Sequence, residues 1–95
     1  MIEIKEKTND DELFLSVIGH GESVTCAAVS ILFQGLAFNY GDRAMYAGVS
    51  GNGIIRIATP TDDERKIWNA FTGVLQALAK QEDEITYQKF PKKGR

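Results

Sequence analysis

The chain has 95 residues, of which 43% are hydrophobic and 25% charged, a composition typical of one small globular domain. Its formal net charge of -2 disfavours nucleic-acid binding driven by overall charge, so no direct contact with nucleic acid is expected. No apolar run approaches the roughly 20 residues that cross a bilayer, and the start of the chain does not resemble a signal peptide, so no membrane association is expected.

The first segment of the chain predicts a β-hairpin. Apolar and polar residues alternate over residues 2–6, which is typical of a half-buried strand. Residues 13–18 are almost all apolar and predict a second strand in a central position. The polar cluster at residues 9–11 predicts the turn between the two strands.

A helix is predicted after this hairpin. From Val24 the apolar residues recur at steps of three and four, with Ser23 as the expected N-cap, and the pattern runs to about Phe38. Gly41 suits the left-handed conformation that commonly ends a helix. The residues expected on the buried side are Val24, Ala27, Ala28, Ile31, Leu32 and Leu36.

The next segment predicts a second hairpin. Residues 43–49 and 54–58 have the composition of two strands. They are joined by SGNG at residues 50–53, a strong signal for a tight turn. Pro60 stops the second of these strands from continuing.

A long helix and a last strand complete the chain. Thr61 and Glu64 have the spacing of a capping box, which predicts that the helix begins there. Trp68 lies beside the apolar stripe of this helix and is expected at the edge of the core or in a dimer contact. Residues 84–88 predict the strand. The stripe itself comprises Ile67, Phe71, Val74, Leu75 and Leu78.

The predicted order is therefore β-β-α-β-β-α-β. This order favours an α+β fold, a two-layer sandwich in which two helices cover one face of a mostly antiparallel sheet. Residues 1–88 are expected to form a single domain, and residues 89–95 a basic, flexible tail. The aromatic residues expected to pack around the first helix and the second hairpin are Phe33, Phe38, Tyr40 and Tyr46.

His20 and Cys26 are the only histidine and the only cysteine in the chain. His20 follows the second predicted strand, and Cys26 lies in the first turn of the predicted helix. A thiol and an imidazole are the minimum parts of a thiol nucleophile with its general base. The N-terminal end of a helix favours a thiolate, and its unpaired amide groups can hold an oxyanion. The alternative is that Cys26 is a small buried apolar residue and His20 a turn residue. A lone cysteine also indicates a reducing compartment, so a cytoplasmic location is expected.

The sequence around these two residues resembles a known signature. Residues 19–21, GHG, and residues 24–30, VTCAAVS, are similar to the motif of the bacterial ribosomal-processing cysteine proteases, the Prp family. Members of that family read approximately Gly-His-Ala, then a glycine-containing loop, then Asp-Ile-Val-Cys-Ala-Ala-Val-Ser. In this chain the loop is shorter, Gly21 stands in place of the alanine, and Ser23 stands in place of the aspartate.

The resemblance implies a cysteine endopeptidase with no cofactor and no metal, in which His20 and Cys26 form the catalytic dyad. It implies further that Gly21, Ser23 and Ser30 bind the substrate. That substrate would be the N-terminal extension of a large-subunit ribosomal protein precursor or a related precursor, viral structural proteins included. The resemblance also implies a homodimer.

Two other functions stay open from the sequence. The shortened loop would suit a non-catalytic, dimeric Prp-like module that binds protein partners without cutting them. The basic residues at 89–95 would suit contact with RNA, which the overall charge disfavours.

Overall fold

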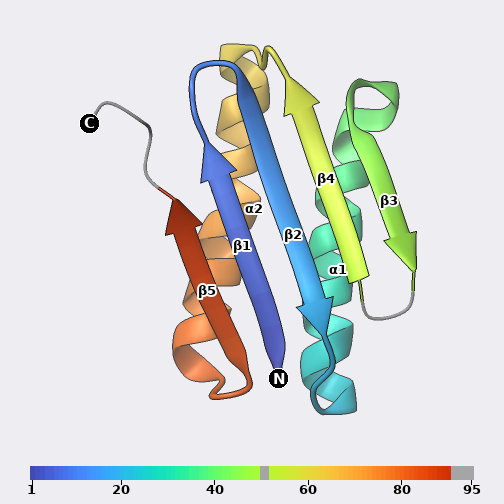
Figure 1. Cartoon of the computed structure of the whole chain (residues 1–95), viewed down its shortest axis with the longest axis vertical. Helices are drawn as coiled ribbons and strands as arrows, with labels where there is room; N and C mark the ends of the chain where they lie inside the picture. Colours follow the sequence, from blue (N-terminus) through green and yellow to red (C-terminus); the bar gives the residue numbers. More distant parts are fainter. Residues whose placement is uncertain (50–51, 91–95) are drawn as a thin grey trace.

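The computed structural model describes residues 1–49 and 52–90. The predicted β-β-α-β-β-α-β order is confirmed, with one short 3-10 helix added after the first helix. The elements are β1 (Ile2–Thr8), β2 (Glu12–Gly19), α1 (Ser23–Tyr40), η1 (Gly41–Arg43), β3 (Met45–Val49), β4 (Asn52–Ala58), α2 (Asp62–Gln81) and β5 (Ile85–Phe90). Figure 1 shows their arrangement.

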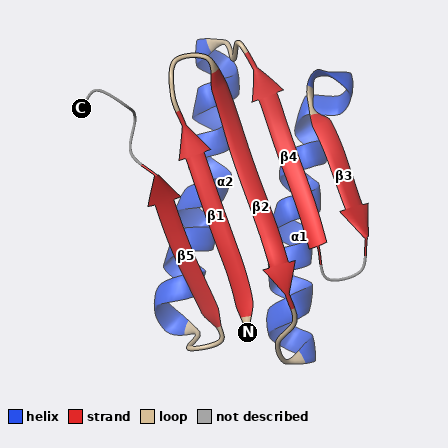
Figure 2. Cartoon of the chain, in the orientation of Figure 1, coloured by secondary structure: helices blue, strands red, loops and turns tan. Residues whose placement is uncertain are grey.

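The five strands form one sheet in the order β3-β4-β2-β1-β5. All neighbouring strands are antiparallel except β1 and β5, which are parallel. Both helices cover the same face of the sheet (Figure 2). The predicted α+β sandwich is therefore confirmed, and β2 takes the predicted central position.

Two predicted segments extend beyond the described residues. The turn predicted at 50–53 includes residues 50 and 51, which lie outside the described part, whereas Asn52 and Gly53 already belong to β4. Of the predicted tail, Lys89 and Phe90 belong to β5 and pair with β1, and residues 91–95 lie outside the described part.

The core lies between the sheet and the two helices. Alternate residues of a strand point to the same face, so one side of each strand can be entirely apolar. The core residues contributed by the strands are Ile2, Ile4, Leu13, Leu15, Ile55, Ile57 and Ile85. Leu36 from α1 and Trp68 and Leu75 from α2 cover them and are fully buried.

The buried side of α1 differs from the predicted stripe. Val24 and Ile31 were expected inside, but they are 83% and 70% exposed, and Phe38 is 73% exposed. None of the 18 residues of α1 is charged, so periodicity alone does not distinguish its inner side from its outer side. The residues that face the core are Thr25, Val29, Phe33, Leu36, Ala37 and Tyr40.

The uncharged composition of α1 has a second consequence. By length and composition alone, the segment Ser23–Arg43 is apolar enough to cross a membrane, contrary to the expectation from the sequence. Its inner side chains, however, pack against the sheet in the core. We therefore interpret it as the core helix of the domain, because a core helix passes the same test of length and composition.

The two ends of α1 also differ from the prediction in detail. The N-cap is Glu22 and not Ser23, and no side chain caps the helix. At the other end α1 continues past Phe38 to Tyr40. Gly41 follows it with a positive φ of 55°, but its ψ of -130° lies outside the predicted left-handed conformation. Gly41 therefore predicted the end of α1 correctly, whereas Ser23 did not predict its N-cap.

Trp68 is fully buried, which corrects its predicted place at the edge of the core. Its indole nitrogen donates a hydrogen bond of 2.7 Å to the carboxylate of Glu6, which is itself fully buried on the inner side of β1. The Tyr87 hydroxyl and the Gln76 amide donate to the other carboxylate oxygen at 2.5 and 3.3 Å. Burial, with a smaller contribution from Glu6, raises the pKa of Tyr87. Three neutral donors thus hold one buried carboxylate in the core.

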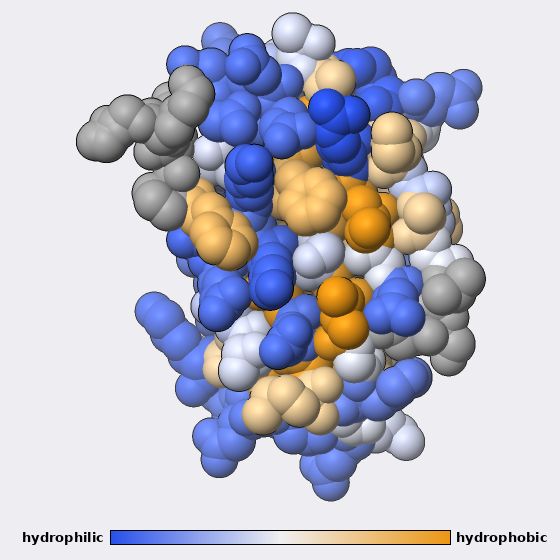
Figure 3. Space-filling view, viewed as in Figure 1, coloured by the Kyte–Doolittle hydropathy of each residue, from blue (hydrophilic) through white to orange (hydrophobic). Residues whose placement is uncertain are grey.

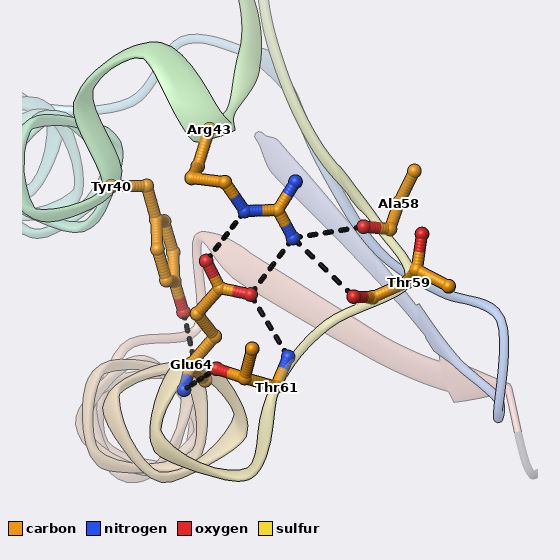
Figure 4. Close-up of polar contacts among 6 residues, drawn as sticks. All are labelled: Tyr40, Arg43, Ala58, Thr59, Thr61 and Glu64. Carbon is orange, nitrogen blue, oxygen red and sulfur yellow. Dashed lines mark hydrogen bonds and ion pairs between the residues drawn. The ribbon is translucent and has the colours of Figure 1, made fainter.

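The predicted capping box at the start of α2 is confirmed, and it belongs to a larger cluster (Figure 4). The guanidinium of Arg43 donates to both carboxylate oxygens of Glu64 at 2.8 Å and to the carbonyl oxygen of Ala58 at 2.9 Å. The Tyr40 hydroxyl donates to the backbone oxygen of Glu64 at 2.7 Å. This cluster joins the end of α1 to the start of α2.

The Glu64 carboxylate makes the stability of the fold depend on pH. The hydrogen bond from Arg43 is the largest cause, and the Thr61 amide the next, of a pKa lowered from 4.5 to about 2. Because the pKa is lower in the folded state, the contribution of Glu64 is present above about pH 4.5 and is lost as the pH falls towards 2. We expect Glu64 to contribute about 1 kcal/mol to the free energy of unfolding above that pH, which is the upper end for an ion pair near solvent.

Urea unfolding between pH 5 and pH 2 tests this expectation. The free energy of unfolding should fall less steeply in Glu64→Gln than in the wild type. Arg43→Gln removes the main cause of the lowered pKa and should flatten the slope in the same way. Equal slopes in all three proteins would contradict the assignment.

Candidate functional site

His20 and Cys26 lie at the same end of the molecule, because β2 ends at Gly19 and α1 begins only four residues later at Ser23. Both residues line one open pocket of about 540 Å³. The pocket is lined by α1, by the end of β2 and by the β3–β4 pair of strands. The chain segment from β2 to α1 therefore brings an imidazole and a thiol to one concave surface.

The Cys26 thiol is held by the loop that precedes the helix. The backbone amide of Gly21 donates to the sulfur at 3.1 Å, and the sulfur can donate to the carbonyl oxygen of Gly21 at 3.4 Å. The side chain is partly buried and reaches the pocket. The sulfur therefore lies at the N-terminal end of α1 with a backbone amide directed at it.

The His20 imidazole is exposed at the rim of this pocket. Within residues 1–49 and 52–90, no hydrogen bond joins the imidazole to the thiol. Only glycine fits at the preceding position, because Gly19 has φ at +110° and a Cβ there would lie 2.2 Å from the carbonyl oxygen of Met1. The backbone oxygen of His20 accepts a hydrogen bond from the Met1 nitrogen. The His20 backbone is thus hydrogen-bonded to the residue that precedes β1, while its side chain is exposed to solvent.

Two aromatic rings and two glycines form the wall of the pocket opposite the loop. The rings of Phe33 and Tyr46 lie with their centroids 5.9 Å apart and their planes at 44°. Gly48 and Gly53 lie directly opposite each other on β3 and β4. A Cβ at Gly53 would lie 2.6 Å from the Phe33 ring, so the glycine makes room for that ring. This part of the pocket is therefore formed by aromatic rings and by backbone without side chains.

The five residues proposed from the sequence do not all reach the pocket. Ser30 lines it together with His20 and Cys26, and its hydroxyl accepts a hydrogen bond of 3.2 Å from Gln34. Gly21 reaches the thiol through its backbone, and Ser23 is an exposed residue at the start of α1. Neither Gly21 nor Ser23 belongs to the pocket lining. In the described part of the chain, no three His, Cys, Asp or Glu side chains come together as a metal site.

Sequence reasoning did not identify Glu84, which contacts the same loop from the turn between α2 and β5. Its carboxylate accepts a hydrogen bond of 2.7 Å from the backbone amide of Glu22. The Thr25 hydroxyl lies 3.4 Å from carboxylate oxygens of both Glu82 and Glu84. These acidic residues are about 60 positions away in the chain, so no local motif could have linked them to the loop.

The chain matches no family model and no curated protein. Its structure is similar to that of an essential ribosomal processing protease, Prp, from Staphylococcus aureus, solved with a substrate peptide. That match has a TM-score of 0.82 at 21% identity and covers 95% of this chain and 100% of the protease. A Streptococcus mutans protein matches with a TM-score of 0.71 at 22% identity, covering 95% of this chain and 94% of that protein.

A hypothetical protein from Staphylococcus aureus matches with a TM-score of 0.77 at 18% identity, covering 95% of this chain and 100% of that protein. Identities this low establish the fold and not the activity. The chain therefore has the fold of the Prp protease over almost its whole length.

Proposed function

We propose that this protein is a Prp-like cysteine endopeptidase in which Cys26 is the nucleophile and His20 the general base. The observation that carries the proposal is that the only thiol and the only imidazole of the chain line one open pocket, in the fold of a protease. A structural cysteine would need neither the open pocket nor the amide directed at its sulfur.

We propose a reaction in two steps. His20 takes the thiol proton, and the Cys26 sulfur attacks the carbonyl carbon of a peptide lying in the pocket. The amide of Gly21 and the unpaired amides of the first turn of α1 can stabilise the charge that develops on sulfur and oxygen. His20 then returns a proton to the leaving amine, and water releases the acyl group from the sulfur.

As substrate we propose the N-terminal extension of a large-subunit ribosomal protein precursor, or a related precursor such as a viral structural protein. The named activity of the Prp protease supports this class of substrate. We propose that the protein acts in the cytoplasm, which rests on its single cysteine.

We propose a homodimer as well, since large apolar side chains are exposed on two sides of the molecule. Val24, Ile31 and Phe38 lie on the outside of α1. Apolar residues, Ile18 and Ile54 among those exposed, also gather on the face of the sheet that the helices leave uncovered (Figure 3). Sedimentation equilibrium tests the dimer, and a monomer at tens of micromolar would contradict it.

The second candidate is a non-catalytic module that binds the same precursors. The observation that favours it is the exposed imidazole, which makes no hydrogen bond to the thiol among the described residues. Such a module would hold a precursor in the pocket and leave it intact.

Incubation with a ribosomal protein precursor that carries its N-terminal extension separates the two functions. The endopeptidase should release the extension, and mass spectrometry of the product gives the new N-terminus. A brief reaction quenched in acid should show the acyl group on Cys26. A precursor that stays bound and uncut would favour the binding module.

A further inference from the structure

We propose that Glu84 is a positioning residue, whose carboxylate fixes the loop between His20 and Cys26 in the conformation that holds the thiol. The importance of this contact for catalysis rests on the function proposed above. The contact itself can be tested by measurements that do not require peptide cleavage. We call the hydrogen bond between the Glu84 carboxylate and the Glu22 amide the loop latch.

The latch acts through one peptide plane. The amide that Glu84 accepts belongs to the peptide bond between Gly21 and Glu22, and the carbonyl of that same bond is the Gly21 oxygen 3.4 Å from the Cys26 sulfur. Because a peptide bond is planar, a carboxylate that fixes the N–H on one side also fixes the C=O on the other. Without the carboxylate this plane can rotate, and the loop no longer presents Gly21 to the sulfur.

A glycine at position 21 is part of the same arrangement. A Cβ at Gly21 would lie 2.5 Å from a carboxylate oxygen of Glu84 and 3.1 Å from its carboxyl carbon. Any larger residue at this position would therefore push the carboxylate away from the loop. Gly21→Ala and Glu84→Ala should remove the same contact by two different routes.

The backbone around Glu84 explains how a distant residue reaches this loop. The Glu84 carbonyl oxygen accepts a hydrogen bond of 2.7 Å from the Ile2 amide, where β5 begins to pair with β1. Glu84 is thereby held at the edge of β1, next to the end of β2. Its side chain is only partly exposed, and it faces the start of α1, where a negative charge is favourable.

A double-mutant cycle on Gly21→Ala and Glu84→Ala tests the latch. The first readout is hydrogen exchange of the Glu22 amide by NMR. We expect it to rise about tenfold or more in each single variant, because a charge-assisted hydrogen bond is lost. The double variant should exchange no faster than either single one. Glu84→Gln keeps an acceptor oxygen and should restore most of the protection.

The second readout is peptide cleavage. Each single variant should lower kcat about tenfold or more, because the nucleophile is displaced, and should leave KM within about twofold. The matched control is Asp83→Ala, which removes a neighbouring, exposed carboxylate and leaves Glu84 in place. Thermal melts confirm that all variants are folded.

Two results would overturn the latch. The first is unchanged exchange of the Glu22 amide in Glu84→Ala, and the second is a double variant in which the losses of amide protection or of kcat from the two single variants add up. The failure of the proposed function is a separate outcome. If no variant and no wild-type protein cleaves a peptide, but the exchange rates change as expected, the latch stands and the peptidase does not.

Discussion

Replacing Cys26 by alanine is expected to abolish peptide cleavage, and replacing His20 by alanine is expected to lower it by about 10²–10⁴. The two losses differ in kind, because Cys26→Ala removes the atom that forms the acyl bond. His20→Ala removes only the proton acceptor, so a thiol still present can react slowly at higher pH. Added imidazole should therefore restore part of the activity of His20→Ala and none of that of Cys26→Ala.

The fold should survive both substitutions. The His20 side chain is exposed, and within residues 1–49 and 52–90 the Cys26 side chain forms hydrogen bonds only to Gly21. Thermal melts should show both variants folded, and Gln88→Ala, an exposed change on β5, should retain full activity. Alkylation by iodoacetamide gives an independent readout, and Cys26 should react more slowly in His20→Ala. Equal cleavage by Cys26→Ala and the wild type would contradict the proposed nucleophile.

The elements of this fold were predictable where the sequence carries a local signal. The alternation of apolar and polar residues predicted β1, and the Thr61–Glu64 spacing predicted the start of α2. Gly41 predicted the end of α1. His20 and Cys26 could be placed near each other because only a short loop separates a strand from a helix there. Local signals of this kind do not depend on the rest of the molecule.

The errors have a common cause in contacts between distant segments. The inner side of α1 could not be identified because the whole helix is uncharged, and packing on the sheet decides which residues are buried. Ser23 was expected to cap α1, whereas the loop amides find acceptors in the Glu84 carboxylate and the Cys26 sulfur. A contact with a carboxylate more than 60 residues away cannot be predicted from the local sequence pattern.

Glu6 is the clearest case, and it leads to the largest expected effect on stability. Its place in the alternation of β1 puts it on the inner side with Ile2 and Ile4, where a glutamate would normally be excluded. Three donors from α2 and β5 make that position tolerable: the Trp68 indole, the Gln76 amide and the Tyr87 hydroxyl. The carboxylate therefore connects β1 to two elements that are far away in the sequence.

Glu6→Leu should lower the free energy of unfolding by about 2–4 kcal/mol, measured by urea denaturation. Leucine fills a similar volume, so the loss comes from the donors left without an acceptor and not from a cavity. Trp68 is fully buried, so its indole N–H cannot form a hydrogen bond to water in place of Glu6. Tyr87 and Gln76 are only partly buried, so leaving their donors without Glu6 costs less free energy. Glu3→Leu is the matched control, since Glu3 lies on the same strand with an exposed side chain, and it should cost little.

The second variant in this test decides whether the lost hydrogen bonds are the cause. Tyr87→Phe removes one donor, so Glu6→Leu should cost less in a Tyr87→Phe background than in the wild type. Equal costs in the two backgrounds would show that the Tyr87 hydroxyl finds another partner when Glu6 is replaced. A cost for Glu6→Leu no larger than that for Glu3→Leu would show that the buried carboxylate itself is as unfavourable as the orphaned donors. In that case the Glu6 carboxylate would determine how β1 packs against α2 and β5, and it would not contribute to net stability.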